Sequence, residues 1–444
     1  MLYAILIILV LYSIQMISGG ILLGEYTFPV TISLYFLINI FYLYKYKRNN
    51  IFCFELLFSI SFFLCTYLTP FLLPLLDSFQ SRIFVDSDII KNKTYSLAFL
   101  GYLCYMIGLL RNVDSTSIGA QVDTRFSKSS ITVSNYLCFA TLVLFYANGG
   151  IGLLSIYNSD GDWTQRLNQW GIYLGFSMLI YSICIVTNFC SNQIKRDSLL
   201  NFIISLPFLF KFNTLFLVVP LILSGYRSNA LQLLIPLLLM YDNAVKKINF
   251  KQMAVLVIGG FVILQIIGMT RGGGSLNTVD NDLASQFRDF IPANGANIYL
   301  VDYADTNGIT YGSNMLLSIL SIVPFLQSFV ISIIGQDSLA PVSSTVYTDE
   351  YSSWSGLGTG MIGDLYYSLG TFGVISLMFL YGYFVSKLGR SKSPYSLVMF
   401  MVFCGNAVFA PRVEYCHMIR SISWAAIFLY FVLKTTNKNQ HIAS

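Results

Sequence analysis

The sequence predicts an all-α protein that crosses a membrane many times, and three observations predict it. Of the 444 residues, 55% are hydrophobic and only 11% are charged, a balance that soluble globular domains do not have. Apolar runs of about 20 residues, the length that crosses a bilayer, recur from end to end. The basic residues gather in short segments between these runs. Lipid is therefore the predicted solvent for most of the surface.

About twelve of these runs are predicted transmembrane helices. They lie at 2–23, 26–44, 51–76, 94–110, 133–148, 170–190, 198–223, 228–241, 252–269, 366–386, 394–410 and 416–433. The eighth run is short for a bilayer, and the seventh contains Pro207, Lys211 and Pro220, so these two are the most irregular. The first run has no basic n-region and no small-residue cleavage site, so we interpret it as a retained helix.

The basic residues predict the orientation of the chain. If the loops alternate between the two sides, the loops of one side hold 16 of the 26 lysines and arginines. Short cytoplasmic loops carry such an excess, so both termini are predicted to be cytoplasmic. The 16 residues are Lys45, Lys47, Arg48, Arg111, Arg125, Lys128, Lys195, Arg196, Lys246, Lys247, Lys251, Lys387, Arg390, Lys392, Lys434 and Lys438.

The spans divide the chain into three parts. Residues 1–269 hold nine predicted spans, 270–365 form one large outer loop, and 366–444 hold the last three spans and a cytoplasmic tail. The loop contains nine acidic residues against only two basic ones, Arg271 and Arg288. Its apolar stretch, 313–334, is interrupted by Pro324. We predict a re-entrant or interfacial pair of short helices there, backing an outer cavity.

Arg227 lies between two apolar runs, in LILSGYRSNALQLL. A charge in the middle of a bilayer costs about 2.5–3.5 kcal/mol on insertion scales, so such a residue is usually functional or at the interface. One interpretation is an arginine whose side chain reaches the headgroup layer. The other is an anion site, because a guanidinium group matches phosphate with two hydrogen bonds. Further arginines on the predicted outer side could converge with it on one pyrophosphate: Arg271, Arg288, Arg412 and Arg420.

The segment APRVEYCHMIR, residues 410–420, links the last two spans. Glu414 is a candidate general base for a substrate hydroxyl, and the alternative is a structural ion pair with Arg412 or Arg420. His417 is the only histidine besides His441. It is either a titratable group of the site or a packed interfacial residue.

Other motifs that could carry chemistry are missing. No His, Cys and acid cluster has metal-ligand spacing, and the eight cysteines form no CxxC pair, so we expect neither metal nor disulfide. The chain has no P-loop, Rossmann glycine run or GxSxG, which predicts no cofactor. Contact with acidic membrane lipid is a sufficient explanation for the net charge of +5, so we predict no nucleic acid partner. The large loop is rich in aromatic residues, which either stack on sugar rings or form a loop core or interface belt: Tyr299, Tyr303, Tyr311, Tyr347, Tyr351 and Trp354.

Several segments, in order, resemble the Wzy-type O-antigen and enterobacterial-common-antigen polymerases. SGYRSNALQLLIPLLL is similar to their Gly-x-Arg turn before an apolar helix, and FRDFIPANGANIYLVDYADTNGITYG, with Arg288 and Asp289, to the Arg-Asp opening of their periplasmic loop. SGLGTGMIGDLYYSLGTFGVISLMFLYG resembles the entry to the following span, and PRVEYCHMIRS the turn before the last helix. The resemblance covers roughly residues 220–435, and Trp354 departs from the more polar residue that we expected there.

The resemblance implies a GT-C-like glycosyltransferase of the bacterial inner membrane with a periplasmic active site. Such enzymes move a growing glycan from undecaprenyl pyrophosphate to a lipid-linked repeat unit. It implies that Arg227, Arg288, Arg412 and Arg420 contact pyrophosphate and that Glu414 is the acceptor base or holds an arginine. Arg271 is a candidate on charge alone. We add His417, Asp289 and Tyr303 as candidate substrate contacts. A chain-length regulator and a flippase of the same pathway are candidate partners.

Two other functions compete with polymerisation. An O-antigen ligase would share the topology and the lipid donor. The ligase family, however, resembles a group of enzymes that rely on a histidine in the large loop, and residues 270–365 contain no histidine. A polysaccharide flippase would be a transporter, with pseudo-symmetric halves and cations in the middle of the membrane. A structural membrane scaffold is a third alternative.

Overall fold

The computed structural model describes most of the chain: residues 2–18, 24–47, 52–72, 85–111, 126–152, 163–191, 199–224, 227–249, 251–253, 255, 259, 290–323, 325–335, 340–351, 358–391 and 393–442. Every regular element within these residues is a helix, as predicted. Six helical segments are long and apolar enough to cross a membrane: η1 with α2 (Gly24–Tyr46), α6 (Asp88–Leu110), α7 (Lys128–Ala147), Gly171–Phe189 of α8 (Trp163–Phe189), α18 (Met361–Leu388) and His417–Thr435 of α20 (His417–Ile442).

The other helices are shorter. They are α1 (Leu2–Ser18), α3 (Phe54–Thr66), α4 (Thr69–Leu72), α9 (Leu199–Ser205), α10 (Phe208–Ser224), α11 (Arg227–Ala244), α14 (Ile291–Asn307), α15 (Ser313–Leu320), α16 (Leu326–Ile334), α17 (Ser343–Glu350), α19 (Pro394–Asn406) and η6 (Ala410–Arg412).

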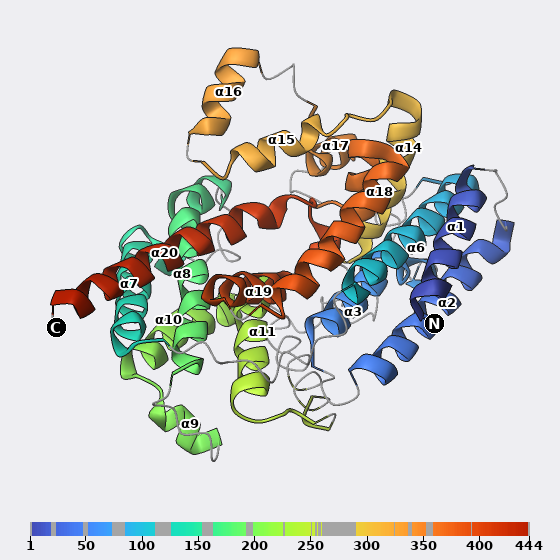
Figure 1. Cartoon of the computed structure of the whole chain (residues 1–444). Helices are drawn as coiled ribbons and strands as arrows, with labels where there is room; N and C mark the ends of the chain where they lie inside the picture. The colour runs from blue at the N-terminus through green and yellow to red at the C-terminus, as the bar shows by residue number, and fades with distance from the viewer. Residues whose placement is uncertain are drawn as a thin grey trace, which may run out of the picture.

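The helices form two groups that share one hydrophobic core (Figure 1). In one group, α6 is surrounded by α1, α2, α14 and α18, with α3 beside α14. In the other, α7, α8, α10, α11, α19 and α20 pack together. The chain passes between the groups from α18 to α19, and η6 contacts both α3 and α18. The residues that directly follow α19, including η6, therefore lie where the two groups meet.

Helix α6 is the centre of the first group, buried continuously from Thr94 to Leu109. Its backbone closely approaches that of α18. A Cβ atom on Gly382 would collide with the carbonyl of Tyr105, and one on Gly108 with the carbonyl of Phe379. Small residues allow this approach between helices in lipid, where packing and not the hydrophobic effect holds helices together.

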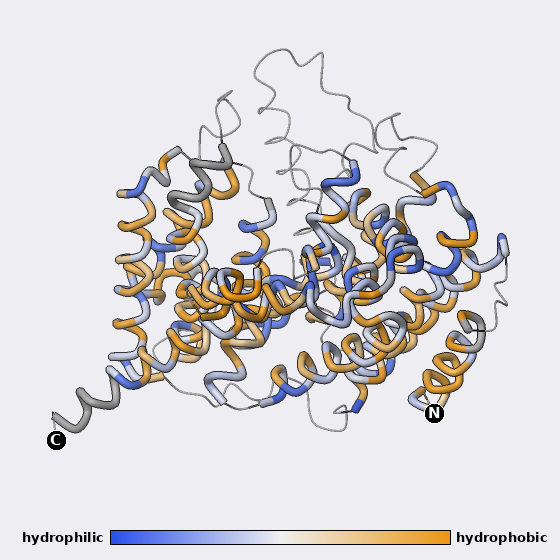
Figure 2. Tube along the Cα trace, turned by 90° about the horizontal axis from the view of Figure 1, so that it is seen from above, coloured by the Kyte–Doolittle hydropathy of each residue, from blue (hydrophilic) through white to orange (hydrophobic). Residues whose placement is uncertain are grey.

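The outward faces of the helices are apolar, as a lipid-facing surface requires. Leu37 and Ile40 of α2 are 62% and 64% exposed, and Leu223 of α10 is 60% exposed. Figure 2 shows apolar residues along most helices of both groups. Exposed leucines and isoleucines on this scale would form an unusually large apolar surface in water. The chain is thus a multi-pass membrane protein.

Several predicted spans differ from the observed helices. The run 51–76 gives α3, which ends at Thr66, and the short α4 after a turn. The run 198–223 breaks into α9 and α10 at Pro207, because proline lacks the N–H that continues a helix. The run predicted at 252–269 lies mostly outside the described residues.

The apolar stretch 313–334 contains two short helices, α15 and α16, on either side of Pro324. Helix α18 begins at Met361, five residues earlier than predicted, and its helical geometry is interrupted at Leu369 and Gly370. The φ angle of Gly370 is 63°, which glycine adopts without strain. The first turns of α18, with Asp364, therefore form a separate short segment.

Candidate active site

A pocket of about 530 Å³ lies between the second helix group and the short helices α15 and α16. We call it the α20 pocket, because the first two turns of α20 contribute His417, Arg420 and Trp424. Ligand pockets in proteins commonly have about 300–1,000 Å³, so this one could hold a sugar with attached phosphate groups.

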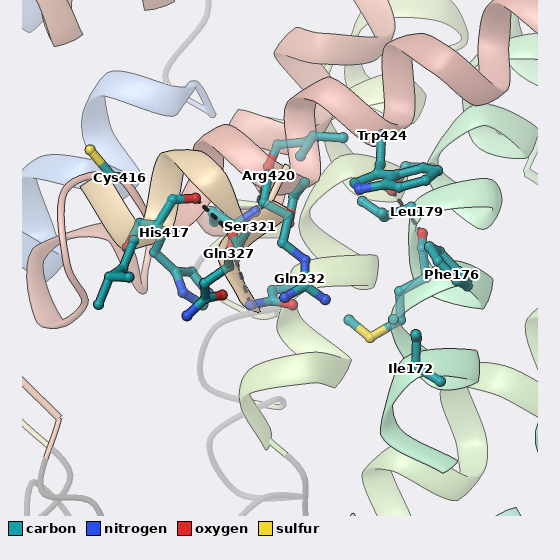
Figure 3. A pocket seen from close by; sticks show the side chains of 18 of the residues that line it. Ile172, Phe176, Leu179, Gln232, Ser321, Gln327, Cys416, His417, Arg420 and Trp424 are labelled. Carbon is teal, nitrogen blue, oxygen red and sulfur yellow. Dashed lines mark hydrogen bonds between the residues drawn. The ribbon is translucent and has the colours of Figure 1, made fainter. Parts of the chain in front are cut away.

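One wall of the α20 pocket is apolar and another is polar. Trp424 and the α8 residues Ile172, Phe176 and Leu179 form the apolar wall (Figure 3). The rings of Phe176 and Trp424 meet edge to face, with centroids 5.6 Å apart. The polar residues come from six helices and from the residue after α15: Ser182, Gln232, Ser318, Ser321, Gln327, Asn406, His417, Arg420 and Ser421. The lining is therefore amphipathic.

Arg420 extends into the pocket toward Gln232 (Figure 3). Helical spacing explains why His417 is beside it, because residues three apart share a helix face. Both residues are exposed, and Arg420 has no ion pair within the part of the chain that the structure describes. A guanidinium group without a carboxylate partner at a pocket wall is available to an anionic ligand.

The pocket is anchored by a contact between α11 and α19. The side-chain amide of Gln232 donates a hydrogen bond to Oδ1 of Asn406, at 3.2 Å. Gly405 permits this, because a Cβ atom there would collide with the carbonyl of Gln232. Asn406 also donates to the carbonyl of Val402, at 2.8 Å. Two amides thus hold each other at fixed positions in the pocket wall.

The turn before α20 carries the other predicted residues of this region. We call residues 410–416 the 410–416 turn. It begins as η6, which contacts α3, and Arg412 there lies over the ring of Phe409, at 5.9 Å from its centroid. The carbonyl of Arg412 accepts a hydrogen bond from the N–H of Thr359, at 3.4 Å. Arg412 and Glu414 do not line the α20 pocket, but they lie within a few residues of His417.

Glu414 is half-buried, and its carbonyl accepts a hydrogen bond from the N–H of His417, at 3.0 Å. Among the described residues, no ion pair joins its carboxylate to Arg412 or Arg420. The alternative of a structural ion pair is therefore not supported. His417 is exposed beside the pocket.

The remaining predicted residues are more scattered. Arg227 is the first residue of α11, about 7.5 Å along the helix axis from Gln232 at 1.5 Å per residue, but its side chain lies outside what the structure describes. Arg271, Arg288 and Asp289 also lie outside the described residues. Tyr303 does not line the α20 pocket.

Tyr303 belongs to a group of tyrosines on α14, α17 and α18. Its ring lies 5.9 Å from that of Tyr299 and 5.8 Å from that of Tyr367. Burial and the nearby Glu350 carboxylate raise the pKa of Tyr299 above its ordinary value, so its hydroxyl stays protonated and donates to Glu350, at 3.0 Å. Tyr299, Tyr303, Tyr347 and Tyr351 pack together in the large loop. Of the other two aromatic candidates, Tyr311 is 83% exposed and Trp354 lies outside the described residues.

The sequence analysis missed several residues that the structure places at the site. Gln232 and Asn406 are polar residues inside apolar helices, a signal that could have found them. Trp424 and Phe176 gave no such signal, since aromatic residues are common in apolar helices. Asp364 was assigned to the loop, although it is almost fully buried in α18, at 1% exposure.

A model of one protein family matches residues 214–440, which is just over half of the chain. The family is described as O-antigen polysaccharide polymerase Wzy. The matched region contains α11, both short helices, α18, the 410–416 turn and α20. No curated protein and no solved structure matches the chain. The match confirms the resemblance noted in the sequence, and the chain belongs to the O-antigen polysaccharide polymerase Wzy family.

Proposed function

We propose that this chain extends a bacterial surface polysaccharide at the periplasmic face of the inner membrane. It would transfer a growing glycan from undecaprenyl pyrophosphate to the end of a lipid-linked repeat unit. The observation that carries the proposal is the α20 pocket, in which Arg420 and the side-chain amides come from the matched region and face an aromatic wall formed by Trp424 and α8.

The chemistry of the pocket suits a sugar that is linked to pyrophosphate. Arg420 supplies a fixed positive charge and planar donors for phosphate oxygens. Gln232, Gln327 and the serines of α15 and the following residue offer donors and acceptors for sugar hydroxyls. Trp424 and Phe176 offer apolar faces for a sugar ring or a prenyl chain.

The direction of the helices supports an outer site. Helices α11 and α20 line the pocket with the part that is distant from their lysines. Gln232 lies near the start of α11, whereas Lys246 and Lys247 follow its end. Likewise, Arg420 is in the first turn of α20 and Lys434 is four turns later. Because basic ends face the cytoplasm, we place the pocket at the opposite, periplasmic side.

We propose a direct displacement at the anomeric carbon of the donor. A hydroxyl oxygen of the acceptor sugar forms the new bond, and the bond from the anomeric carbon to the pyrophosphate oxygen breaks. Glu414 takes the hydroxyl proton, and Arg420 with Arg412 stabilises the negative charge on the departing undecaprenyl pyrophosphate. Arg227, Arg271 and Arg288 are further candidates for that contact, and Asp289 and Tyr303 for the sugars. No cofactor or metal takes part in this scheme.

The wider fold belongs to the same proposal. We infer about twelve spans in a GT-C-like arrangement, with both termini in the cytoplasm. A chain-length regulator and a flippase of the same pathway would be its partners.

The decisive test is a lipopolysaccharide gel of a strain that lacks the gene, beside the same strain complemented with it. We expect the deletion to lose the ladder and to keep a core that bears one repeat unit. Loss of every surface repeat, with long lipid-linked chains accumulating, would instead indicate a ligase. Single lipid-linked units retained inside would indicate a flippase, and an unchanged ladder would contradict all three functions.

A further inference from the structure

The carboxylate of Asp364 is almost fully buried, at 1% exposure, near the start of α18. Among the described residues, no lysine or arginine forms an ion pair with it. A buried carboxylate without a cation is costly unless hydrogen bonds compensate it. Packing alone therefore does not explain an aspartate at this position.

Two donors from different parts of the chain reach this carboxylate. Oδ2 accepts a hydrogen bond from the N–H of Tyr415, at 2.9 Å, and Oδ1 accepts one from Nδ2 of Asn314, at 3.3 Å. Tyr415 lies in the 410–416 turn, directly after Glu414, and Asn314 lies in α15. One side chain thus ties α18 to the turn and to a wall of the α20 pocket.

The orientation of Asn314 is fixed by its other partners. Its Oδ1 accepts from the hydroxyl of Thr310, at 2.6 Å, and its Nδ2 also donates to Oγ of Ser368, at 2.8 Å. The amide nitrogen therefore faces Asp364, which must offer acceptors to two donors at once. Aspartate has two acceptor oxygens, whereas asparagine would turn an NH₂ group toward one of the donors.

Backbone hydrogen bonds fix the position of the short helical segment that carries this carboxylate. The interruption of α18 releases the carbonyls of Tyr367 and Ser368, and these accept hydrogen bonds from the N–H groups of Thr310 and Gly312, at 2.9 and 3.0 Å. The N–H of Gly363 donates to Oδ1 of Asn297, at 2.8 Å. The short segment with Asp364 is therefore held by α14 and by the residues before α15.

We infer that Asp364 is a positioning residue, which holds the 410–416 turn, and with it Glu414, His417 and Arg420, against the α15 wall of the pocket. It does not line the pocket, so it acts through the turn. Displacement of a catalytic group by about 1 Å is enough to slow a reaction greatly. This inference rests on the proposed function, because the residues that it positions are those of the proposed transfer.

The experiment uses the full chain, purified into lipid nanodiscs, with a lipid-linked repeat unit as substrate. Asp364→Asn and Asn314→Asp each break the complementarity, because they place two NH₂ groups or two carboxylates face to face. The double variant N314D/D364N restores it, with the amide and the carboxylate exchanged. Ser376→Ala is the control, because its hydroxyl donates to the carbonyl of Phe372 in the part of α18 beyond the interruption, at 2.7 Å, so it removes a comparable hydrogen bond from the same helix.

We expect each single variant to lower kcat at least about tenfold, with KM changed less than about threefold. The exchange variant should recover to within about threefold of the parent, and the kcat of Ser376→Ala should also lie within about threefold of the parent. Rates are normalised to folded protein, from size exclusion and thermal melting.

Two results would overturn the role of Asp364. One is a parental kcat in Asp364→Asn, and the other is an exchange variant that folds normally but is as slow as the single variants. Activity that falls only in proportion to lost folded protein would likewise overturn it. A parent chain that elongates nothing would overturn the proposed function, and the role of Asp364 with it.

Discussion

The side chains of Gln232 and Asn406, 174 positions apart in the chain, are hydrogen-bonded in the wall of the α20 pocket, with 3.2 Å between nitrogen and oxygen. This hydrogen bond therefore fixes the orientation of both side chains. In the described part of the chain, Oε1 of Gln232 has no hydrogen-bond donor, so it can accept from a ligand hydroxyl.

We predict that Gln232→Leu lowers kcat/KM for a lipid-linked repeat unit about 3–15-fold. A neutral hydrogen bond contributes about 0.5–1.5 kcal/mol, and here both a ligand contact and the orientation of Asn406 are lost. The measurement is a steady-state assay in nanodiscs. Gln252→Leu, an exposed glutamine beyond the opposite end of α11, is the control and should match the parent.

Arg420 gives a second prediction, which separates charge from geometry. Arg420→Ala should lower kcat/KM about 10–150-fold, because a hydrogen bond to a charged group contributes about 1.5–3 kcal/mol. Arg420→Lys keeps the charge but loses the planar pair of donors, so it should recover only part of the loss. Lys434→Ala, at the other end of α20, is the control. Full activity in Arg420→Ala would exclude Arg420 from the substrate site.

Much of the fold could be predicted from the sequence, because a membrane span is a local property. A run such as 133–148 must satisfy its backbone internally, so it forms a helix wherever it packs. Helix α7 accordingly covers this run. The boundary of α18 was harder, because its first turns contain Asp364, a residue that pattern reasoning assigns to a loop. Donors from distant parts of the chain, among them Tyr415 and Asn314, compensate the burial of that carboxylate.

The candidate site could be predicted only in part. His417 and Arg420 were found because charge stands out in apolar sequence, and they share a helix face. The partners that complete the pocket come from α8, α11 and α19, and their proximity depends on tertiary packing. No local pattern predicts that Gly405 lets the backbone of α11 approach. Tyr303 was a candidate because of its residue type; its ring contacts that of Tyr299, and it does not line the α20 pocket.

A third prediction concerns the stability of the fold. Lys47 and Glu55 form a largely buried ion pair, with 3.0 Å between Nζ and Oε1 and side chains 14% and 11% exposed. Lys47→Met leaves the Glu55 carboxylate buried without its cation, and breaking such a pair costs about 3–5 kcal/mol. We expect a clearly lower melting temperature in nanodiscs. Lys45→Met, at an exposed lysine in the same turn, should melt like the parent.

The pair also predicts a pH dependence. Burial alone would lower the pKa of Lys47, but the Glu55 carboxylate outweighs it and raises the pKa above its ordinary value. A raised lysine pKa stabilises the fold fully below the unfolded value, about 10.4, and this contribution disappears as the pH rises through the folded value. The difference in melting temperature between parent and Lys47→Met should therefore be constant from pH 6 to about 9. A difference that shrinks within that range would contradict the pairing.

The contact between α6 and α18 gives a fourth prediction. A Cβ atom at Gly382 would collide with the carbonyl of Tyr105, and backbone atoms cannot move aside as a side chain can. Gly382→Val should therefore separate the two helices and reduce the yield of folded protein, at a cost of at least about 1–3 kcal/mol. Gly171→Val, on α8, is the control, because no atom lies within 4 Å of a Cβ there. Equal yields and melting temperatures for both variants would mean that α6 and α18 do not pack this closely.

The last prediction concerns the proposed base. Glu414 has a carboxylate without an ion-pair partner in the described residues, and its backbone is fixed by the neighbouring bond from Tyr415 to Asp364. If it takes the acceptor proton, Glu414→Gln should lower kcat about 10²–10⁴-fold, with little change in KM because the amide has the same shape. Glu414→Asp should retain intermediate activity, since the carboxylate is kept but moved back by one methylene. The control is Glu350→Gln, at an exposed carboxylate of α17 that accepts a hydrogen bond from the Tyr299 hydroxyl. A kcat of Glu414→Gln within about threefold of the parent would contradict the role of Glu414 as the base. The rate would then depend on positioning of the substrates and on stabilisation of the leaving group by the arginines, without a carboxylate base.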